Sequence, residues 1–173
     1  LKCIRKAGIV MYEQEEHIAS ERRVLASLNH PFINKLSASF QDEWELYMML
    51  EPLMGGELTR FVTGGNFISE PAARFYAACV VSALTYLHDL KVAYRDLKPE
   101  NLVMDSDGYL KMVDFGFAKV VEDRTYTFCG TPEFIAPEIV TNSGHSMSAD
   151  WWAMGILVYN MLTGTTPFLP EDD

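Results

Sequence analysis

The sequence predicts an α+β fold, and three features of its 173 residues support this. Short apolar segments with the composition of strands occur at residues 36–40, 46–50, 102–104 and 109–113. Longer segments with helical periodicity occur at about residues 13–28, 69–88 and 149–163. A hydrophobic content of 49% is enough to fill a core around these elements.

The amino-terminal segment is expected to form a strand at residues 1–4 and a helix at about 13–28. The apolar stripe of this helix consists of Ile18, Leu25 and Leu28. Glu21 lies on the same stripe, where a buried carboxylate needs a partner because its desolvation is costly. Lys2 on the preceding strand is the natural partner. Alternatively, Glu21 points to solvent with its basic neighbours.

After the strands at 36–40 and 46–50, periodicity stops at residues 51–57, where Pro and Gly interrupt the chain. Ser69 and Pro71 then begin a long helix, because Ser is a good N-cap and Pro is tolerated in the first turn. The stripe predicted to be core in this helix is Phe75, Cys79, Ala83 and Leu87. Cys79 is interpreted as buried packing rather than as a reactive thiol.

Residues 94–101 (Tyr-Arg-Asp-Leu-Lys-Pro-Glu-Asn) contain the groups best suited to chemistry. Asp96 is a candidate base for a hydroxyl nucleophile, and Lys98 can reach a phosphoryl group during transfer. The alternative is a surface loop with scattered charges.

Asn101 and Asp114 offer hard oxygen atoms of the kind that magnesium takes as ligands. The turn at residues 105–108 makes the strands between them a hairpin, which would bring both residues to one end of the ladder. Residues 94–101 and a second motif, Asp-Phe-Gly at 114–116, together supply the parts that phosphoryl transfer needs.

The last helix, at about 149–163, is apolar nearly all round and is therefore expected to be buried on every side. Only ten residues follow it, and no Lys or Arg occurs after Arg124 to pair with Glu138. These features predict a piece of a larger domain.

Composition restricts the function classes. A net charge of −10 argues against nucleic-acid binding and favours basic partners. No apolar run is long enough to span a bilayer. The three cysteines (Cys3, Cys79 and Cys129) have no metal-like spacing and are expected to be reduced thiols in a cytoplasmic protein.

The two motifs have the order and spacing of the catalytic and metal-binding loops of eukaryotic protein kinases, which the chain resembles over essentially all its length. The resemblance implies ATP and Mg²⁺ as cofactors. It also implies a two-lobe kinase-like fold that is incomplete at both ends. Residues 1–50 would be a partial small lobe, 51–57 the hinge, and 58–173 a partial large lobe that is mainly helical.

The resemblance also implies a nucleotide site. The expected ATP-binding residues are Lys2, Glu21, Leu50, Glu51, Leu53, Glu57 and Val103. Lys2 would hold phosphate with Glu21 as its partner on the helix. Leu50 would guard the back of the pocket, and the backbone of Glu51 and Leu53 would bind adenine.

Residues 125–138 are similar to the activation segment of the AGC group of Ser/Thr kinases. Thr127 aligns with the threonine that is phosphorylated in that group, where phosphate adds nearly two negative charges. The cations expected to pair with it are Arg95, Lys119 and His17, although a residue such as His17 is, by itself, more often a solvated helix residue.

Substrate-binding residues are implied in the same way. Thr131 resembles the threonine that binds the catalytic Asp and Lys in Ser/Thr kinases, which makes tyrosine the less suitable acceptor. An apolar pocket after the acceptor would be formed by Phe128, Pro132 and Ile135. Glu57 and Glu100 would bind arginines before the acceptor, so the substrates are expected to be basic there. Asn160 stands where relatives place a second arginine-binding glutamate.

Within the AGC group the chain is most similar to the cGMP-dependent protein kinases, with the catalytic subunit of cAMP-dependent kinase next. The segments that indicate this are residues 47–51, 74–81 and 144–150. Regulatory cyclic-nucleotide-binding domains would lie outside this chain. Tyr94 replaces the histidine of the general kinase signature, as is common in the group.

The Gly-rich loop expected before Lys2 and the helices expected after Phe168 are not in the sequence. We therefore expect the chain by itself to bind nucleotide poorly and to fold marginally. A non-catalytic, kinase-like scaffold is the alternative function. A small-molecule kinase on a related fold is disfavoured by the activation segment.

Overall fold

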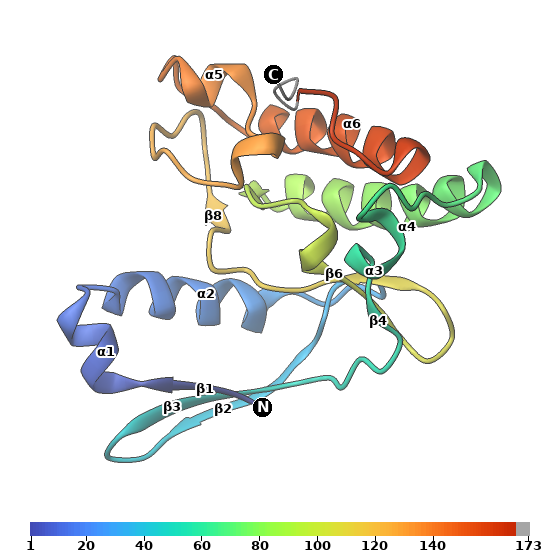
Figure 1. The fold of residues 1–173 in the computed structure, drawn as a ribbon. Helices are drawn as coiled ribbons and strands as arrows, with labels where there is room; N and C mark the ends of the chain where they lie inside the picture. Colours follow the sequence, from blue (N-terminus) through green and yellow to red (C-terminus); the bar gives the residue numbers. More distant parts are fainter. Residues whose placement is uncertain (169–173) are drawn as a thin grey trace.

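The computed structural model describes residues 1–168, and its first part is a three-stranded antiparallel sheet in the order β1-β3-β2 (Figure 1). The strands are β1 (Lys2–Arg5), β2 (Leu36–Gln41) and β3 (Glu45–Leu50). The strands predicted at 36–40 and 46–50 are thus confirmed to within one residue. Lys2 pairs with Met48, and because side chains alternate along a strand, Lys2 and Ile4 share the half-buried face of β1.

Two helices accompany this sheet where the sequence predicted one. They are α1 (Lys6–Met11) and α2 (Glu15–Ser27). Glu13 between them has a φ of 51°, in the left-handed region, which interrupts the helix and turns the chain. The helix predicted at about 13–28 is therefore confirmed as α2, which begins two residues later, whereas α1 was not predicted. A non-glycine residue with this backbone conformation leaves no clear signal in the sequence.

The second part of the described chain is built on two long helices, α4 (Glu70–Asp89) and α6 (Ser148–Thr163), which pack against each other (Figure 1). Ser69 is the N-cap residue of α4 and Pro71 lies in its first turn, as predicted. The shorter elements are β4 (Gly56–Glu57), α3 (Thr59–Val62), β5 (Val92–Ala93), η1 (Pro99–Asn101), β6 (Leu102–Met104), β7 (Leu110–Met112), β8 (Lys119–Val120), η2 (Pro132–Phe134) and α5 (Pro137–Val140). Residues 169–173 of the expected large lobe lie outside the described residues.

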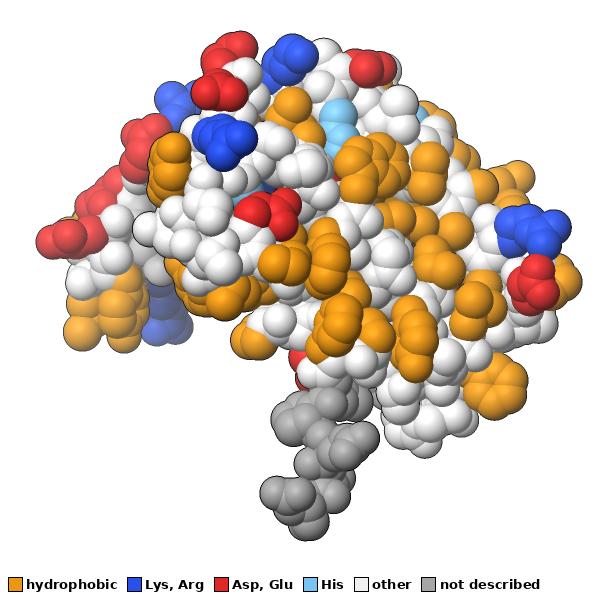
Figure 2. All heavy atoms as spheres, turned by 90° about the horizontal axis from the view of Figure 1, so that it is seen from above, with side chains coloured by type: hydrophobic (Ala, Val, Ile, Leu, Met, Phe, Trp, Pro, Cys, Tyr) orange, Lys and Arg blue, Asp and Glu red, His pale blue; other side chains and the backbone are white. Residues whose placement is uncertain are grey.

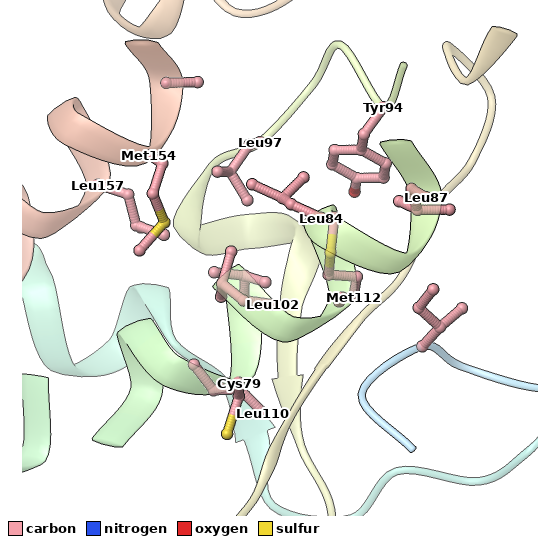
Figure 3. Close-up of a cluster of buried hydrophobic side chains, with 14 of the residues drawn as sticks. Cys79, Leu84, Leu87, Tyr94, Leu97, Leu102, Leu110, Met112, Met154 and Leu157 are labelled. Carbon is pink, nitrogen blue, oxygen red and sulfur yellow. The ribbon is translucent and has the colours of Figure 1, made fainter. Parts of the chain in front are cut away.

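The main hydrophobic core lies where α4, α6 and the β6–β7 hairpin meet (Figure 3). The predicted stripe of α4 is buried at Cys79, Ala83 and Leu87, which are 3%, 0% and 0% exposed. The prediction is wrong for Phe75, which is 44% exposed. Its ring lies 5.3 Å from that of Tyr109, at the edge of the core.

The helix α6 is not buried on every side, contrary to the prediction. Trp151, Tyr159 and Leu162 are 42%, 44% and 40% exposed, whereas Leu157 and Met161 on the inner face are fully buried. Hydrophobic side chains gather on the face of the molecule seen in Figure 2. Neither α6 nor any other helix among residues 1–168 is long and apolar enough to cross a membrane.

Replacing a buried leucine of α4 tests the role of this core in stability. Leu84→Ala is expected to lower the free energy of unfolding by roughly 2–5 kcal/mol, because Leu84 is fully buried and its loss leaves a cavity. The same change at Leu90, which is 45% exposed, is expected to cost less than about 1 kcal/mol. Urea unfolding monitored by circular dichroism measures both, and equal losses would contradict the assigned core.

Candidate active site

The β6–β7 hairpin brings the expected oxygen ligands to one end of its ladder. Leu102 pairs with Met112, and the backbone N–H of Val113 donates to the carbonyl oxygen of Asn101 at 2.9 Å. Asp114 follows directly, and its side chain is 55% exposed. The Asn101 amide nitrogen donates to Asp96 Oδ2 at 2.8 Å, which leaves Asn101 Oδ1 as the oxygen available to a cation.

The carboxylate of Asp96 is almost buried, and the surrounding side chains satisfy both of its oxygens. Thr131 Oγ1 donates to Oδ1 at 2.9 Å, and Lys98 Nζ lies 3.0 Å from Oδ2, beside the Asn101 amide. Lys98 Nζ also donates to Thr131 Oγ1 at 2.8 Å. A buried charge with this many partners is held in one orientation. The segment around Thr131 is thereby tied to the loop around Asp96.

Lys2 and Glu21 form an ion pair between β1 and α2, with Nζ and Oε1 2.6 Å apart. The Glu21 side chain is 3% exposed, which rules out the alternative in which it points to solvent. Lys2 Nζ also lies 3.8 Å from Asp114 Oδ1. The lysine therefore connects the first lobe to the end of the β6–β7 hairpin.

Two cavities adjoin this ion pair. One has a volume of about 340 Å³ and is lined by five of the residues expected to bind ATP, namely Lys2, Leu50, Glu51, Leu53 and Val103. The other, of about 150 Å³, extends past Glu21 to Asp114 and Phe115. Both are lined by Lys2, Asn34, Leu50 and Val113. A larger cavity of about 550 Å³ lies between α2 and the β2–β3 pair and contains none of the expected site residues.

The segment between the two lobes is fixed by Glu51. Its backbone N–H donates to the carbonyl oxygen of Lys35 at 2.9 Å, and its carboxylate accepts two hydrogen bonds from Lys111 Nζ at 2.9 and 2.8 Å. Glu57, also expected to bind ATP, lies outside both cavities and is exposed on β4, where it pairs with Val103.

None of the expected phosphate-binding cations forms a hydrogen bond with the exposed Thr127 within residues 1–168. Lys119 Nζ donates to Thr125 Oγ1 at 3.2 Å, and Arg95 Nε donates to the carbonyl oxygen of Phe117 at 2.7 Å. Arg95 Nη1 is buried and has no partner among the described residues. Burial lowers the pKa of Arg95. The exposed His17 ring lies 6.1 Å from that of Phe117.

The expected substrate-binding residues are mostly on the surface. Glu57, Glu100, Phe128 and Pro132 are exposed, and Ile135 is half-buried. Ile135 lines a narrow cavity of about 10 Å³ beside Arg95 and Asp96, in which neither Phe128 nor Pro132 takes part. The three apolar residues therefore do not share a cavity among those found in the described structure.

Asp150, in the first turn of α6, anchors the loop that carries Asp96. It is 1% exposed, and its carboxylate accepts hydrogen bonds from the backbone N–H groups of Tyr94 and Arg95 at 2.9 and 2.8 Å. His88 Nε2 lies 2.8 Å from the same carboxylate. Sequence reasoning missed this residue. An acid within an apolar helix was the available signal, but its partners are more than fifty residues away.

The whole chain, residues 1–173, matches the family model described as "Protein kinase domain". It is 53% identical to rat cGMP-dependent protein kinase 2 over 97% of this chain and 22% of that protein. It is 50% identical to the cAMP-dependent protein kinase catalytic subunit of Dictyostelium discoideum over 99% of this chain and 26% of that protein. It is 47% identical to the cAMP-dependent protein kinase catalytic subunit 3 of Drosophila melanogaster over 99% of this chain and 29% of that protein. The chain thus spans roughly a quarter of the length of these relatives.

Replacing Asp150 tests its anchoring role. Asp150→Asn keeps the shape of the side chain but places an amide N–H against at least one buried N–H donor. The free energy of unfolding is therefore expected to fall by about 1–3 kcal/mol. Asp107→Asn, in an exposed turn, is the matched control and is expected to change stability by less than about 0.5 kcal/mol. Urea unfolding measures both variants. Equal stability of the two would show that Asp150 does not hold the loop.

Proposed function

Because the chain belongs to the protein kinase family, we propose that it transfers the γ-phosphoryl group of ATP to serine or threonine in proteins, with Mg²⁺ as its metal. The observation that carries the proposal is the Asp96 carboxylate, held by Lys98, Asn101 and Thr131. Asn101 of this group directly precedes the β6–β7 hairpin, and Asp114, two residues after β7, borders the cavity next to Lys2 and Glu21.

In this mechanism Asp96 accepts a hydrogen bond from the substrate hydroxyl and orients it for attack. Lys98 stabilises negative charge on the phosphoryl group as it moves. The hydrogen bond from Thr131 holds Asp96 in place, and the resemblance of Thr131 to the corresponding threonine of Ser/Thr kinases supports an aliphatic hydroxyl over a tyrosine as acceptor.

Asn101 and Asp114 would hold the metal, and Lys2 the nucleotide phosphates, kept in position by Glu21. Two protein oxygens suit Mg²⁺, because this ion takes most of its ligands from phosphate and water. When bound, it neutralises charge on the phosphates during transfer. The purine would occupy the cavity of about 340 Å³ between Leu50, Glu51, Leu53 and Val103.

We further propose that the substrates are basic before the acceptor residue. The exposed carboxylates of Glu57 and Glu100 and the net charge of −10 support this. Neither carboxylate forms an ion pair among residues 1–168, so both are available to arginine. Phe128, Pro132 and Ile135 would contact an apolar residue after the acceptor.

Control of activity is proposed at two levels. Phosphate on the exposed Thr127 would draw the side chains of Arg95 and Lys119 away from their present partners, which would reorder the segment that carries Thr131. Dependence on cGMP, through domains outside this chain, is supported by the similarity to cGMP-dependent protein kinase 2. The unpaired thiols Cys3, Cys79 and Cys129 support a cytoplasmic location.

Replacing Asp96 tests the proposed chemistry. In the whole protein, Asp96→Ala is expected to lower kcat for a serine peptide by roughly 10²–10⁴, because a positioned base is lost. The exposed Asp123, changed to Asn, is the control and should leave kcat unchanged. Transfer of labelled phosphate from ATP to serine, threonine and tyrosine peptides gives the measurement. Near-normal turnover by Asp96→Ala, or a preference for tyrosine, would contradict the proposal.

The substrate preference is tested separately. Glu57→Gln and Glu100→Gln are each expected to reduce the advantage of arginine-containing over alanine-containing peptides by roughly fivefold in kcat/KM, since one exposed charge contact is lost. Turnover of the alanine peptide should stay the same. Glu122→Gln, another exposed acid, should alter neither value. A wild-type preference for acidic residues in these positions would rule out the proposed specificity.

A further inference from the structure

Lys111 is a lysine of the β6–β7 hairpin whose charge is directed at the hinge. It lies on β7 between Leu110 and Met112, whose side chains are buried in the main core (Figure 3). Because side chains alternate along a strand, Lys111 points to the opposite face, which it shares with its cross-strand partner Val103. Val103 lines the cavity of about 340 Å³, so Lys111 is on the face of the hairpin next to that cavity.

The ammonium group of Lys111 is committed to the first residue of the hinge. Nζ donates to both carboxylate oxygens of Glu51, at 2.9 and 2.8 Å, and it has no other ion-pair partner among residues 1–168. The lysine side chain is 12% exposed and that of Glu51 is 37% exposed. Water and salt screen such a partly buried pair less than a surface pair, and removal of one charge leaves the other poorly solvated.

The hinge is held at two points only by backbone hydrogen bonds. The N–H of Glu51 donates to the carbonyl oxygen of Lys35 in the small lobe at 2.9 Å, and the N–H of Gly55 donates to that of Met104 in the large lobe at 2.9 Å. Residues 52–54 form no backbone hydrogen bond within the described part of the chain. The ion pair with Lys111 is therefore the polar link between the beginning of the hinge and the large lobe.

This ion pair lies at a wall between two cavities. Glu51 and Pro52 line both the cavity expected to hold the nucleotide and another one of about 480 Å³ on the other side of the hinge. Lys111 lines the second cavity. Without Lys111, Glu51 would lose its link to the large lobe, and the wall that it forms would be free to move away from the nucleotide.

We propose that Lys111 is a positioning residue that holds the hinge against the nucleotide through Glu51 and thereby slows the release of the product nucleotide. Its ammonium group is committed to Glu51, so the transfer step itself does not depend on it. The effect is one of binding and release, which limit the turnover of many enzymes. This inference rests on the proposed function, since it assumes that the cavity of about 340 Å³ holds the purine of ATP.

The test measures nucleotide release and phosphoryl transfer separately in the whole protein. The variants are Lys111→Met, Glu51→Gln, the double variant and Lys111→Arg. Lys35→Met is the matched control, because Lys35 is exposed, lines the same second cavity and forms no ion pair among residues 1–168. Stopped-flow fluorescence measures the release of N-methylanthraniloyl-ADP. Rapid-quench single turnover at saturating ATP measures the transfer step.

Lys111→Met is expected to release the ADP analogue roughly fivefold faster and to raise its Kd by a similar factor, because a charge-assisted pair is lost. The single-turnover rate should stay the same. Glu51→Gln should act in the same direction, and the double variant should be no faster than Lys111→Met, because both changes remove one interaction. Lys111→Arg can still bind the carboxylate through two hydrogen bonds and should restore slow release. Lys35→Met should match the wild type.

The possible failures are distinguishable. Release from Lys111→Met at the same rate as from Lys35→Met would overturn the inference and leave the proposed function standing. A lower melting temperature and a slower transfer step without recovery in Lys111→Arg would also overturn it, because Lys111 would then serve folding alone. If Lys111→Met does not fold, the release rate of Glu51→Gln decides the question. A wild type that neither binds the analogue nor transfers phosphate would remove the proposed function as well.

Discussion

The buried carboxylate of Asp150 is the constraint on which the geometry of the site depends. It accepts hydrogen bonds from the backbone N–H groups of Tyr94 and Arg95, so the first turn of α6 fixes the loop before Asp96. Arg95 has a φ of 70°, a conformation that a non-glycine residue adopts only where its surroundings compensate the strain. Asp114, at the other end of the site, has a φ of 54°. Strained backbone thus occurs directly before Asp96 and at Asp114, the two carboxylates of the proposed mechanism.

This anchoring has a direct consequence for Asp96. Because the loop backbone is fixed, the Asp96 carboxylate is held at one place and has the same partners there. Lys98 and Asn101 come from its own loop, whereas Thr131 comes from a segment thirty-five residues further along the chain. Thr131 donates to Asp96 Oδ1, and leaving a buried acceptor without its partner costs about 1–3 kcal/mol. A movement of the segment that carries Thr131 therefore alters the hydrogen bonding of Asp96. The proposed phosphorylation of Thr127 could act on the catalytic carboxylate through this hydrogen bond.

Local patterns predicted those parts of the site that lie close together in the sequence or on one helix face. The hairpin that unites Asn101 and Asp114 followed from a turn between two apolar runs, and the burial of Glu21 followed from its place on an apolar stripe. The left-handed Glu13 and the exposed face of α6 depend on backbone conformation and on packing between distant elements, and neither leaves a periodic signal. The roles assigned to the site residues, from Lys2 to Ile135, stay predictions of the resemblance until activity is measured.

Asn34 illustrates how a residue that lines a cavity escapes sequence reasoning. In the sequence it is a polar residue between an apolar connection and a strand, which is an ordinary place for a surface loop. The bridge between Ile33 and Met112 instead places Asn34 at the wall of both cavities, with its Oδ1 atom buried and without a partner among the described residues. Lys2 and Glu51 already form ion pairs with Glu21 and Lys111, so they hold the cavity in shape rather than distinguish one ligand from another. Discrimination between ligands comes from groups that only the right ligand can satisfy, because the wrong ligand leaves them buried and unpaired.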